Sequence, residues 1–573
     1  MTSARNFLLI ALLLIGFLLY MQWQEDYSRA PNAAVETAPS STPAGISTAP
    51  AASTPAPANA DVPPASASTA TPAPNTPDSI SASPPTAEPV VVTTDVLRVE
   101  IDPNGGNIVV ADLLAYLQQP GDFAHPVRLL DRRDATFFVA QSGLVSANAP
   151  APDHQAHFTV EKNAYTLDAG AKSIEVPLLW TDATGLGVRK VFVFTRGSYV
   201  IEQRQEITNN SSVSWSGNAY RQLQRVPPVI DTAGLKGYSN TDRYSFAGAA
   251  WYSPGDKFQK LGFDAFEKSP LQKEIVGGWV AMLQHYFFAA WIPQSNETEA
   301  YSTTPNAKAQ PTRYIIRTKS PGLTVAPGET KTDSARLYVG PKLQGALEEI
   351  APGLSLTVDY GIFTVIAEPL HTLLAMLHKL TGNWGWAIIL LVLLIKAVFF
   401  KLSEAQFRSG AKMRKLQPRL AALKERYGDD RQKLNTAMME LYKKEKINPA
   451  AGCLPMLIQI PVFFALYWVL LESVELRQAP FALWIQNLTA PDPYFVLPIL
   501  NGAIMIATQY LTPAVGMDPT QAKMMKIMPV VFAVLFALFP AGLVLYYVVN
   551  GGLGLLQQWI ITKRIQSSEA AKA

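Results

Sequence analysis

Residues Trp384 to Phe400 read WGWAIILLVLLIKAVFF, an apolar run that contains one formal charge, Lys396. This run is close to the length that a helix needs to cross the hydrocarbon core of a bilayer. A lysine at the centre of such a helix costs about 2.5–3.5 kcal/mol on insertion scales, so it usually faces protein or water and carries function. The alternative is that Lys396 snorkels to the membrane surface, because Lys401 follows only five residues later.

Other apolar runs of similar length predict more membrane-spanning helices. Four of them follow the first, at about 453–471, 494–511, 527–539 and 543–561. A further run, Phe7–Tyr20, lies near the N-terminus and is not followed at once by the small residues of a signal-peptide cleavage site. We therefore expect residues 1–24 to be an uncleaved signal-anchor helix, which makes six spans in all.

The charges between the runs predict the topology. Residues 401–446 contain thirteen Lys or Arg against six acidic residues, whereas residues 472–493 contain one basic residue, Arg477. Basic loops stay on the cytoplasmic side of the membrane. Both termini and the basic loop should therefore be cytoplasmic, and the long region between the first two spans should be exported.

The basic loop itself has helix signals. Ser403 can cap a helix that runs to about Tyr427, and the residues from Gly428 to Asp430 interrupt it. A second helix should continue to about Lys446. We predict a charged helical hairpin over residues 403–447.

The exported region divides by composition. Within it, 47 of residues 31–90 are Ala, Pro, Ser or Thr, so residues 25–90 are predicted to be an extended tether. Residues 91–354 contain short alternating runs separated by Gly, Pro and Asn turns, which is typical of a large antiparallel β-sandwich. Residues 355–382 should form an interfacial amphipathic segment, and residues 383–573 the helical membrane core.

Several functional classes lack support in the sequence. No metal-ligand cluster and no Gly-rich phosphate loop can be recognised, and we interpret His154 and His157 as a surface pair without function. The formal net charge of +3 does not predict a nucleic-acid partner, and the single cysteine, Cys453, excludes an internal disulfide framework. We expect no cofactor, no metal and no catalytic residue.

Polar residues gather at one depth of the predicted spans. Gln459 and Gln509 lie in the cytoplasmic half of their helices, as Lys396 does, while the outer half offers aromatic and aliphatic side chains. This distribution predicts a hydrophilic groove that is open to the cytoplasm and closed on the outside. Any one glutamine could instead act only as a hydrogen-bonding contact between helices.

Several segments resemble the YidC/Oxa/Alb family of membrane-protein insertases. The segments are Asn448–Pro455 (NPAAGCLP), Leu457–Pro461 (LIQIP), Val474–Phe481 (VELRQAPF) and Phe539–Tyr547 (FPAGLVLYY). The resemblance covers essentially the whole chain and implies a bacterial inner-membrane protein with a five-helix core and a periplasmic super-sandwich. It implies that Gln459, Gln509 and Tyr547 line the substrate groove. The groove charge is commonly arginine in the family, where this chain has Lys396.

The resemblance also implies a function and its partners. The partners would be nascent membrane-protein clients, the lipid bilayer, the Sec translocon, and the ribosome and signal recognition pathway, which would contact the cytoplasmic hairpin. The expected activity is insertion, with lateral release of apolar segments into lipid, and assistance in folding. Two other functions remain as alternatives. A secondary transporter would need inverted repeats, which the five core spans do not show. An anchored periplasmic enzyme is less well supported, because the distinctive motifs concentrate in the membrane half.

Overall fold

The computed structural model describes residues 61–63, 88–229, 241–243, 245–428, 430–445, 454–511 and 519–570. The predicted anchor helix and the segment Asn448–Cys453 lie outside these residues, as does most of the predicted tether. Residues 61–63 of the tether are described. The Asp61 carboxylate accepts hydrogen bonds from the side chains of Gln224 and Asn306, at 3.2 and 2.7 Å.

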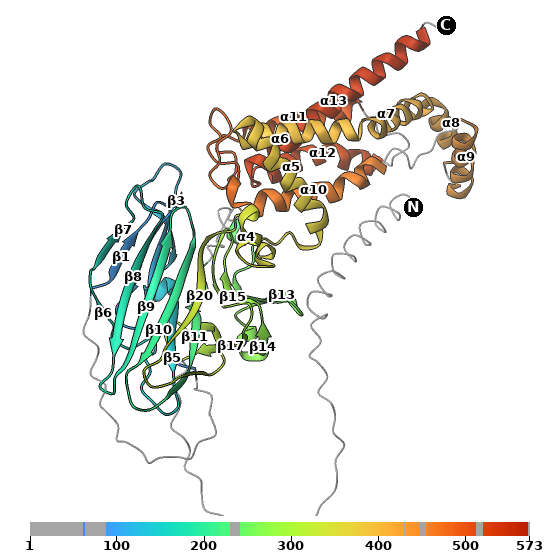
Figure 1. Ribbon diagram of the computed structural model, residues 1–573. Helices are drawn as coiled ribbons and strands as arrows, with labels where there is room; N and C mark the ends of the chain where they lie inside the picture. The colour runs from blue at the N-terminus through green and yellow to red at the C-terminus, as the bar shows by residue number, and fades with distance from the viewer. Residues whose placement is uncertain are drawn as a thin grey trace, which may run out of the picture. The chain divides into compact units, whose positions relative to one another are not determined.

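The chain forms two compact units. Residues 412–449 belong to one unit, and the other contains residues 58–411 and 450–573. The larger unit begins with the predicted β-sandwich, which has an 11-stranded and a 9-stranded sheet. Figure 1 shows the long strands of both sheets. The first sheet is made of β1 (Val90–Thr93), β2 (Leu97–Asp102), β3 (Asn107–Leu117), β4 (Pro126–Leu130), β5 (Phe138–Val145), β7 (Ala164–Thr166), β11 (Trp215–Arg225), β14 (Gln272–Val276), β17 (Thr298–Asn306), β18 (Arg313–Lys319) and β19 (Leu323–Val325). The second is made of β6 (Thr159–Val160), β8 (Ser173–Thr181), β9 (Leu186–Thr195), β10 (Val200–Asn209), β12 (Gly248–Ser253), β13 (Lys257–Leu261), β15 (Trp279–Leu283), β16 (Phe287–Ile292) and β20 (Thr330–Pro341).

Alternation of apolar and polar residues places one face of several strands in the core, whereas β5, β15 and β16 are buried on both faces. In β2 the buried residues are Leu97, Val99 and Ile101, and the side chains between them are half-exposed. The pairing is antiparallel throughout both sheets except between β1 and β7, which run parallel. The predicted antiparallel sandwich is therefore confirmed.

The interior of the sandwich also contains buried charges. The Arg221 guanidinium on β11 pairs with Glu299 and Asp333, and all three side chains are at most 9% exposed. The Lys190 amine on β9 donates to the carbonyl oxygens of Gly105 and Ser142, at 2.7 and 2.9 Å. Each buried charge is thus compensated by groups of the opposite sheet or a neighbouring strand, as burial requires.

The predicted surface pair of histidines is wrong for one member. His154 is buried, and its Nδ1 lies 2.6 Å from the Tyr220 hydroxyl, whereas His157 is exposed. Burial lowers the pKa of His154 to about 4. The local sequence could not reveal this, because strand β11 covers His154 from 66 residues away.

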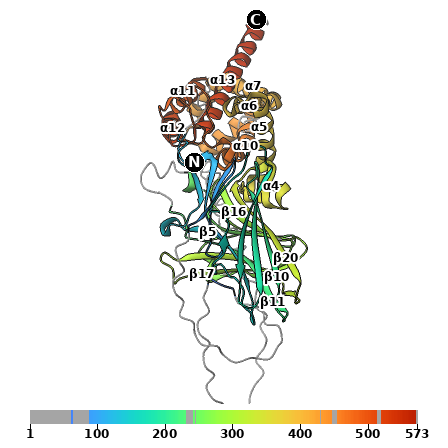
Figure 2. The same cartoon turned by 60° about the vertical axis from the view of Figure 1, so that its left-hand side comes forward.

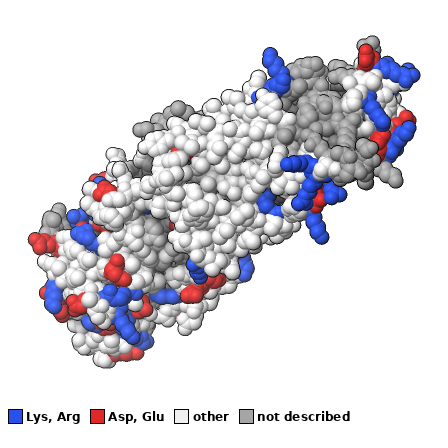
Figure 3. All heavy atoms as spheres, turned by 90° about the horizontal axis from the view of Figure 1, so that it is seen from above, with Lys and Arg blue, Asp and Glu red and all other residues white. Residues whose placement is uncertain are grey.

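The region after the sandwich is helical. It contains α4 (Gln344–Ile350), α5 (Thr364–Thr381), α6 (Trp384–Val398), α7 (Phe400–Lys415), α8 (Gln417–Tyr427), α9 (Arg431–Lys444), α10 (Leu454–Glu472), α11 (Val496–Leu511), α12 (Pro519–Phe536) and α13 (Ala541–Ala570); the short helix α3 (Ala265–Lys268) belongs to the sandwich. Helix α5 packs against α6 and α10, α6 packs against α13, and α11 packs against α12 and α13. Figure 2 shows these helices grouped together in a second view. Figure 3 shows a broad band of surface on which charged side chains are sparse.

The helix lengths support part of the predicted membrane topology. Of the predicted spans, Ala541–Arg564 is long and apolar enough to cross a membrane, and α6 with the first part of α7, bent by 67°, passes the same test as a pair. Gly361–Thr381 is also long and apolar enough to cross, although the sequence predicted it as part of an interfacial segment. Shorter apolar stretches lie within three further helices: Gln459–Glu472 in α10, Val496–Tyr510 in α11 and Lys526–Phe536 in α12. The count of six spans and the interfacial position of residues 355–382 therefore remain predictions.

The helical hairpin differs from its prediction at the first helix. Ser403 does not cap that helix, because its N–H donates to the Phe399 carbonyl oxygen inside the helical chain. The predicted single helix is divided into α7 and α8 at Leu416, where Pro418 occupies the first turn of α8. Proline is favourable in a first turn and unfavourable in a helix interior, which explains the break. The second helix, α9, is capped by Asp430, whose carboxylate accepts the Lys433 N–H.

The sandwich contacts the segment that follows α10. Nε2 of His285 lies 2.9 Å from the Leu471 carbonyl oxygen, and the buried side chains of Lys342 and Glu472 lie 4.0 Å apart. Arg477 donates to the Leu117 carbonyl oxygen at 2.8 Å. These contacts place the end of β3 beside the end of α10.

Candidate functional site

Helix α6 positions Lys396 within the helical region. The Asn383 side chain caps the helix by accepting the N–H groups of Gly385 and Trp386. Lys396 occupies the last turn, where a positive charge interacts favourably with the helix dipole. Its side chain is half-buried, whereas Leu394, about 200° around the same helix, is 43% exposed.

Lys396 lines a small cavity between α6, α7, α10 and α13. The cavity volume is about 40 Å³. Its lining residues are Ile395, Lys396, Phe399, Leu402, Ser403, Gln459, Val462 and Asn550. Four polar side chains therefore converge within an otherwise apolar set of helices.

The amine of Lys396 lies close to α13. A Cβ atom added at Gly554 would lie 3.4 Å from the Lys396 Nζ, so the glycine leaves room for the amine. Within the described part of the chain, Lys396 forms no ion pair, and no acidic residue lines the cavity. A positive charge is thus presented to the cavity without a compensating carboxylate.

Gln459 reaches the same cavity from α10. It is half-buried, and its side chain is hydrogen-bonded to the hydroxyl of Tyr546 on α13. Because Tyr546 is only 1% exposed, this hydrogen bond holds the Gln459 amide in a defined position. The structure therefore brings together two of the four predicted site residues, Lys396 and Gln459.

The other two predicted site residues lie outside this lining. Gln509 is half-buried near the end of α11. The ring of Tyr547 packs against those of Phe463 and Phe536, with centroid distances of 5.1 and 4.6 Å. A role of Gln509 and Tyr547 in the groove therefore remains a prediction.

Two polar lining residues, Ser403 and Asn550, are absent from the sequence-based prediction of the site. The sequence predicts Ser403 to be a helix cap. Its spacing of seven from Lys396 would place both residues on one face if a single helix ran through them. Asn550 lies seven residues before Gln557, a polar residue of the same helix α13. This spacing is the signal in the sequence that Asn550 and Gln557 lie on one face of α13.

The size of the cavity limits what it can hold. A water molecule needs roughly 10–15 Å³ of such volume, so the cavity accommodates about three waters and not a polypeptide segment. Its chemistry favours a polar or acidic guest, because the lining provides an amine, two amides and a hydroxyl. A polypeptide would have to widen it.

Comparison with known proteins identifies the family. Residues 89–373 match the model of the YidC periplasmic domain, and residues 376–569 match that of the 60Kd inner membrane protein. The chain belongs to the YidC insertase family. Its membership extends over nearly all of the sequence, so both the sandwich and the helical region are family features.

Curated relatives of the family align over almost the full chain. The membrane protein insertase YidC of Stenotrophomonas maltophilia (strain R551-3) is 47% identical, covering 98% of this chain and 97% of the relative. The YidC of Nitrosococcus oceani is 45% identical and covers 99% of both chains. A solved structure titled "Active YidC insertase crystal structure with the first transmembrane domain resolved" covers 82% of this chain, with 19% identity and a TM-score of 0.38. That score is too low to support a comparison of detail.

Proposed function

We propose that this protein is a membrane insertase that receives nascent hydrophobic segments in a cytoplasm-facing groove around Lys396 and releases them sideways into the inner membrane. It acts as an insertase and not as an enzyme, in keeping with the relatives that align over nearly its whole length. The observation that carries the groove proposal is the cavity in which Lys396 meets Gln459, Ser403 and Asn550 without an acidic partner among its lining residues.

The proposed topology has six spans, with both termini and the hairpin in the cytoplasm and the sandwich in the periplasm. It is supported by the excess of Lys and Arg in residues 401–446. In this orientation the Lys396 end of α6 faces the cytoplasm, so its cavity is entered from the side on which clients are synthesised.

The mechanism follows from the cost of moving polar chain through hydrocarbon. Each unpaired backbone group or charge in the bilayer core costs several kcal/mol, so a client's hydrophilic flank cannot cross unaided. A hydrated cavity that extends part of the way shortens the dry path. The uncompensated charge of Lys396 attracts acidic flanks into the cavity. Burial of the client's apolar segment in lipid then drives its sideways release.

The proposed partners follow from the exposed elements. The hairpin helices α8 and α9 carry many basic side chains and an ion pair between Arg419 and Glu445 at 2.6 Å. A defined, basic hairpin is suited to contact with the ribosome and the signal recognition pathway. We propose that the protein works alone or with the Sec translocon, and that it also assists the folding of its clients.

Substitution of Lys396 tests the electrostatic part of the proposal. Lys396→Ala should reduce insertion of clients with acidic translocated flanks more than that of clients with neutral flanks, and Lys396→Glu should reduce it most. The measurement is protease protection of the two client types in vesicles that contain equal amounts of each variant. Full insertion of acidic clients by Lys396→Glu would show that the charge has no such role.

Cysteine accessibility tests whether the cavity is open to the cytoplasm. In a Cys453→Ser background, a cysteine at position 396 should react with a membrane-impermeant thiol reagent added from the cytoplasmic side. A cysteine at Leu394 is the matched control, because it lies about 200° around the same helix and is 43% exposed. Equal protection of both positions in the correctly inserted protein would contradict the groove.

A further inference from the structure

The turn between β3 and β4 carries an exposed aromatic residue at the membrane-proximal end of the sandwich. Phe123 in this turn is 83% exposed. The Leu117 carbonyl oxygen, just before the turn, accepts hydrogen bonds from Arg477 at 2.8 Å and from Gln478 at 2.9 Å. These two residues follow the end of α10 by only five and six positions. The turn is therefore tied to the outer end of a proposed membrane span.

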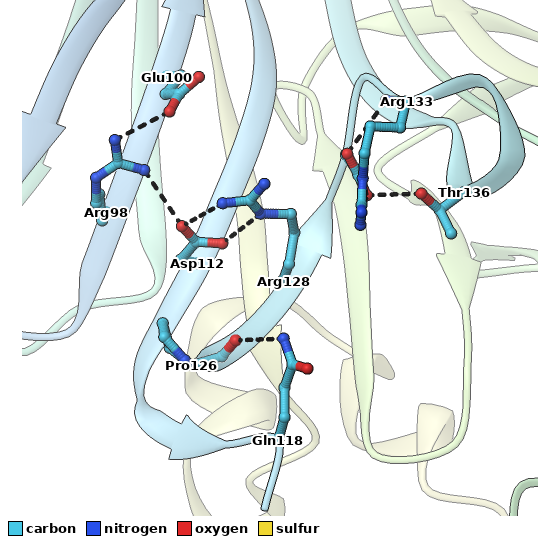
Figure 4. A network of polar contacts seen from close by, with 9 residues as sticks. Arg98, Glu100, Asp112, Gln118, Pro126, Arg128, Arg133 and Thr136 are labelled. Atoms are coloured by element: carbon cyan, nitrogen blue, oxygen red, sulfur yellow. Dashed lines mark hydrogen bonds and ion pairs between the residues drawn. The ribbon is translucent and has the colours of Figure 1, made fainter. Parts of the chain in front are cut away.

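Arginine side chains surround the base of this turn (Figure 4). Arg128 donates to both carboxylate oxygens of Asp112, at 2.7 and 3.0 Å, and Arg98 donates to Asp112 at 3.3 Å. Arg133 donates to Asp131 at 2.8 Å. The two aspartates are almost fully buried, whereas the arginine side chains are 36–69% exposed. The carboxylates thus orient the guanidinium groups from behind and leave their outer edges toward solvent.

The three arginines line a hollow of about 680 Å³, with Phe123 and His125 among the other lining residues. Its lining includes one acidic residue, Asp112. Glu100, which pairs with Arg98 at 3.0 Å, and Asp131, which pairs with Arg133, are not among the lining residues, so most of the charged groups that line the hollow are guanidinium groups. A separate cleft of about 630 Å³ shares Gln118 with the hollow and is lined by Arg477 and Asn487. The loop after α10 therefore lies against that cleft, and it contributes nothing to the lining of the arginine hollow.

The chemistry of this surface fits a phospholipid. A guanidinium group held in a fixed orientation binds phosphate oxygens through paired N–H donors. An exposed phenylalanine beside such groups can bury its apolar ring at the boundary between headgroups and acyl chains. We propose that the β3–β4 turn docks on the outer leaflet, with Phe123 in the interfacial region and Arg98, Arg128 and Arg133 bound to lipid phosphates.

This docking would give the sandwich a second attachment to the membrane side, in addition to its contacts with the end of α10. It rests on the proposed topology, in which that end of α10 faces the periplasm. A soluble acidic peptide would use the arginines but would leave Phe123 in water. Contact of Phe123 with lipid is therefore the property that distinguishes a bilayer from such a partner.

The test uses the full-length protein in vesicles of phosphatidylethanolamine and phosphatidylglycerol. In a Cys453→Ser background, Phe123→Cys is labelled with an environment-sensitive fluorophore, and quenching by lipids spin-labelled near the headgroup is measured. Val213→Cys is the matched control. Val213 is 70% exposed in the turn between β10 and β11, and the register of β11, β5 and β3 places it at the opposite end of the sandwich.

We expect strong quenching at position 123 and none above background at position 213. Leu393→Cys on α6 reports the insertion of the helical region, so its quenching separates the two proposals. If position 393 is quenched and position 123 is not, the docking proposal is overturned while the topology stands. If position 393 is not quenched, the topology fails as well.

A charge substitution tests the arginines separately. Arg133→Gln should lower the quenching at position 123, because Arg133 lines the hollow. Arg132→Gln removes the same charge from the neighbouring exposed residue, which is not among the lining residues, and should leave the quenching unchanged. Equal effects of the two substitutions would overturn the phosphate site and leave only a general surface attraction.

Discussion

Two lysines show how differently the two halves of the molecule treat a charge removed from water. In the sandwich, Lys190 is fully buried, its amine donates to two carbonyl oxygens, and it lies 4.9 Å from the ring centroid of Phe158. In the helical region, Lys396 is half-buried and lines a cavity with three other polar side chains. No hydrogen bond or ion pair joins it to another residue in the described ranges.

The difference follows from what each region has to do. A buried charge whose hydrogen bonds are made to the protein's own carbonyl oxygens, away from solvent, contributes to a single rigid arrangement and is not accessible to a ligand. A charge that faces a cavity without a partner keeps that capacity, at a cost in stability. The sandwich therefore uses buried charge for structure, and the proposed groove uses it for binding.

Deletions should give the largest contrast between the two regions. Removal of residues 404–444 should abolish insertion, because the protein then has no hairpin to receive clients. Removal of residues 91–330 should leave insertion largely intact, since the proposed groove is built from α6, α7, α10 and α13. Insertion would be measured with a defined client at matched levels of membrane-localised protein. A silent hairpin deletion together with an inactive sandwich deletion would reverse our assignment of function.

Substitution of a buried ion pair should give the next largest effect, on folding. Arg221→Met leaves the carboxylates of Glu299 and Asp333 buried without their partner. The free energy of unfolding of the sandwich should fall by about 3–5 kcal/mol. Denaturant unfolding of the full-length protein in detergent, followed by tryptophan fluorescence, measures this loss.

The control for Arg221 is an exposed pair in the same sandwich. Arg189 and Glu206 form an ion pair at 3.0 Å, with side chains 41% and 29% exposed. Arg189→Met should cost at most about 1 kcal/mol. Similar losses of unfolding free energy for the two substitutions would show that burial does not increase the contribution of the Arg221 ion pairs to stability.

Lys190 should make a smaller contribution, which appears as a change in the free energy of unfolding with pH. Burial lowers the pKa of Lys190 to about 7, against about 10.4 in an unfolded chain. Between these values the unfolded state binds the additional proton, so the free energy of unfolding should rise with pH by about 1.4 kcal/mol per unit from this group. Lys190→Met should remove that rise. The measurement is the difference in unfolding free energy between pH 7 and pH 9 for both proteins, and identical slopes would refute the assignment.

The smallest effect is expected for Lys396→Arg. The charge is retained, and the guanidinium can also be hydrated in the cavity, so insertion of acidic and neutral clients should remain close to wild type. The client-protection measurement used for Lys396→Ala applies here as well. A loss as large as that of Lys396→Ala would mean that the shape of the amine, packed near Gly554, matters more than its charge.

Much of the architecture was determined by the sequence alone. Alternation of apolar residues predicted the sandwich, because a strand buries every second side chain whatever its partner. Apolar runs predicted α6, α10, α11, α12 and α13 to within a few residues except at the start of α12 and the end of α13, and the interruption at residues 428–430 predicted the turn of the hairpin. The depth of Lys396 in its run already marked it as a candidate site residue.

Tertiary structure alone decided which polar residues meet. Lys396, Gln459 and Asn550 are separated by 63 and 91 residues, and only the rotation and packing of three helices bring them to one cavity while Gln509 and Tyr547 lie outside its lining. The same holds for His154, which β11 covers, and for the arginine hollow beside the β3–β4 turn. The physical reason is that a local pattern records which face of an element is buried, whereas the identity of the covering partner depends on how distant elements pack.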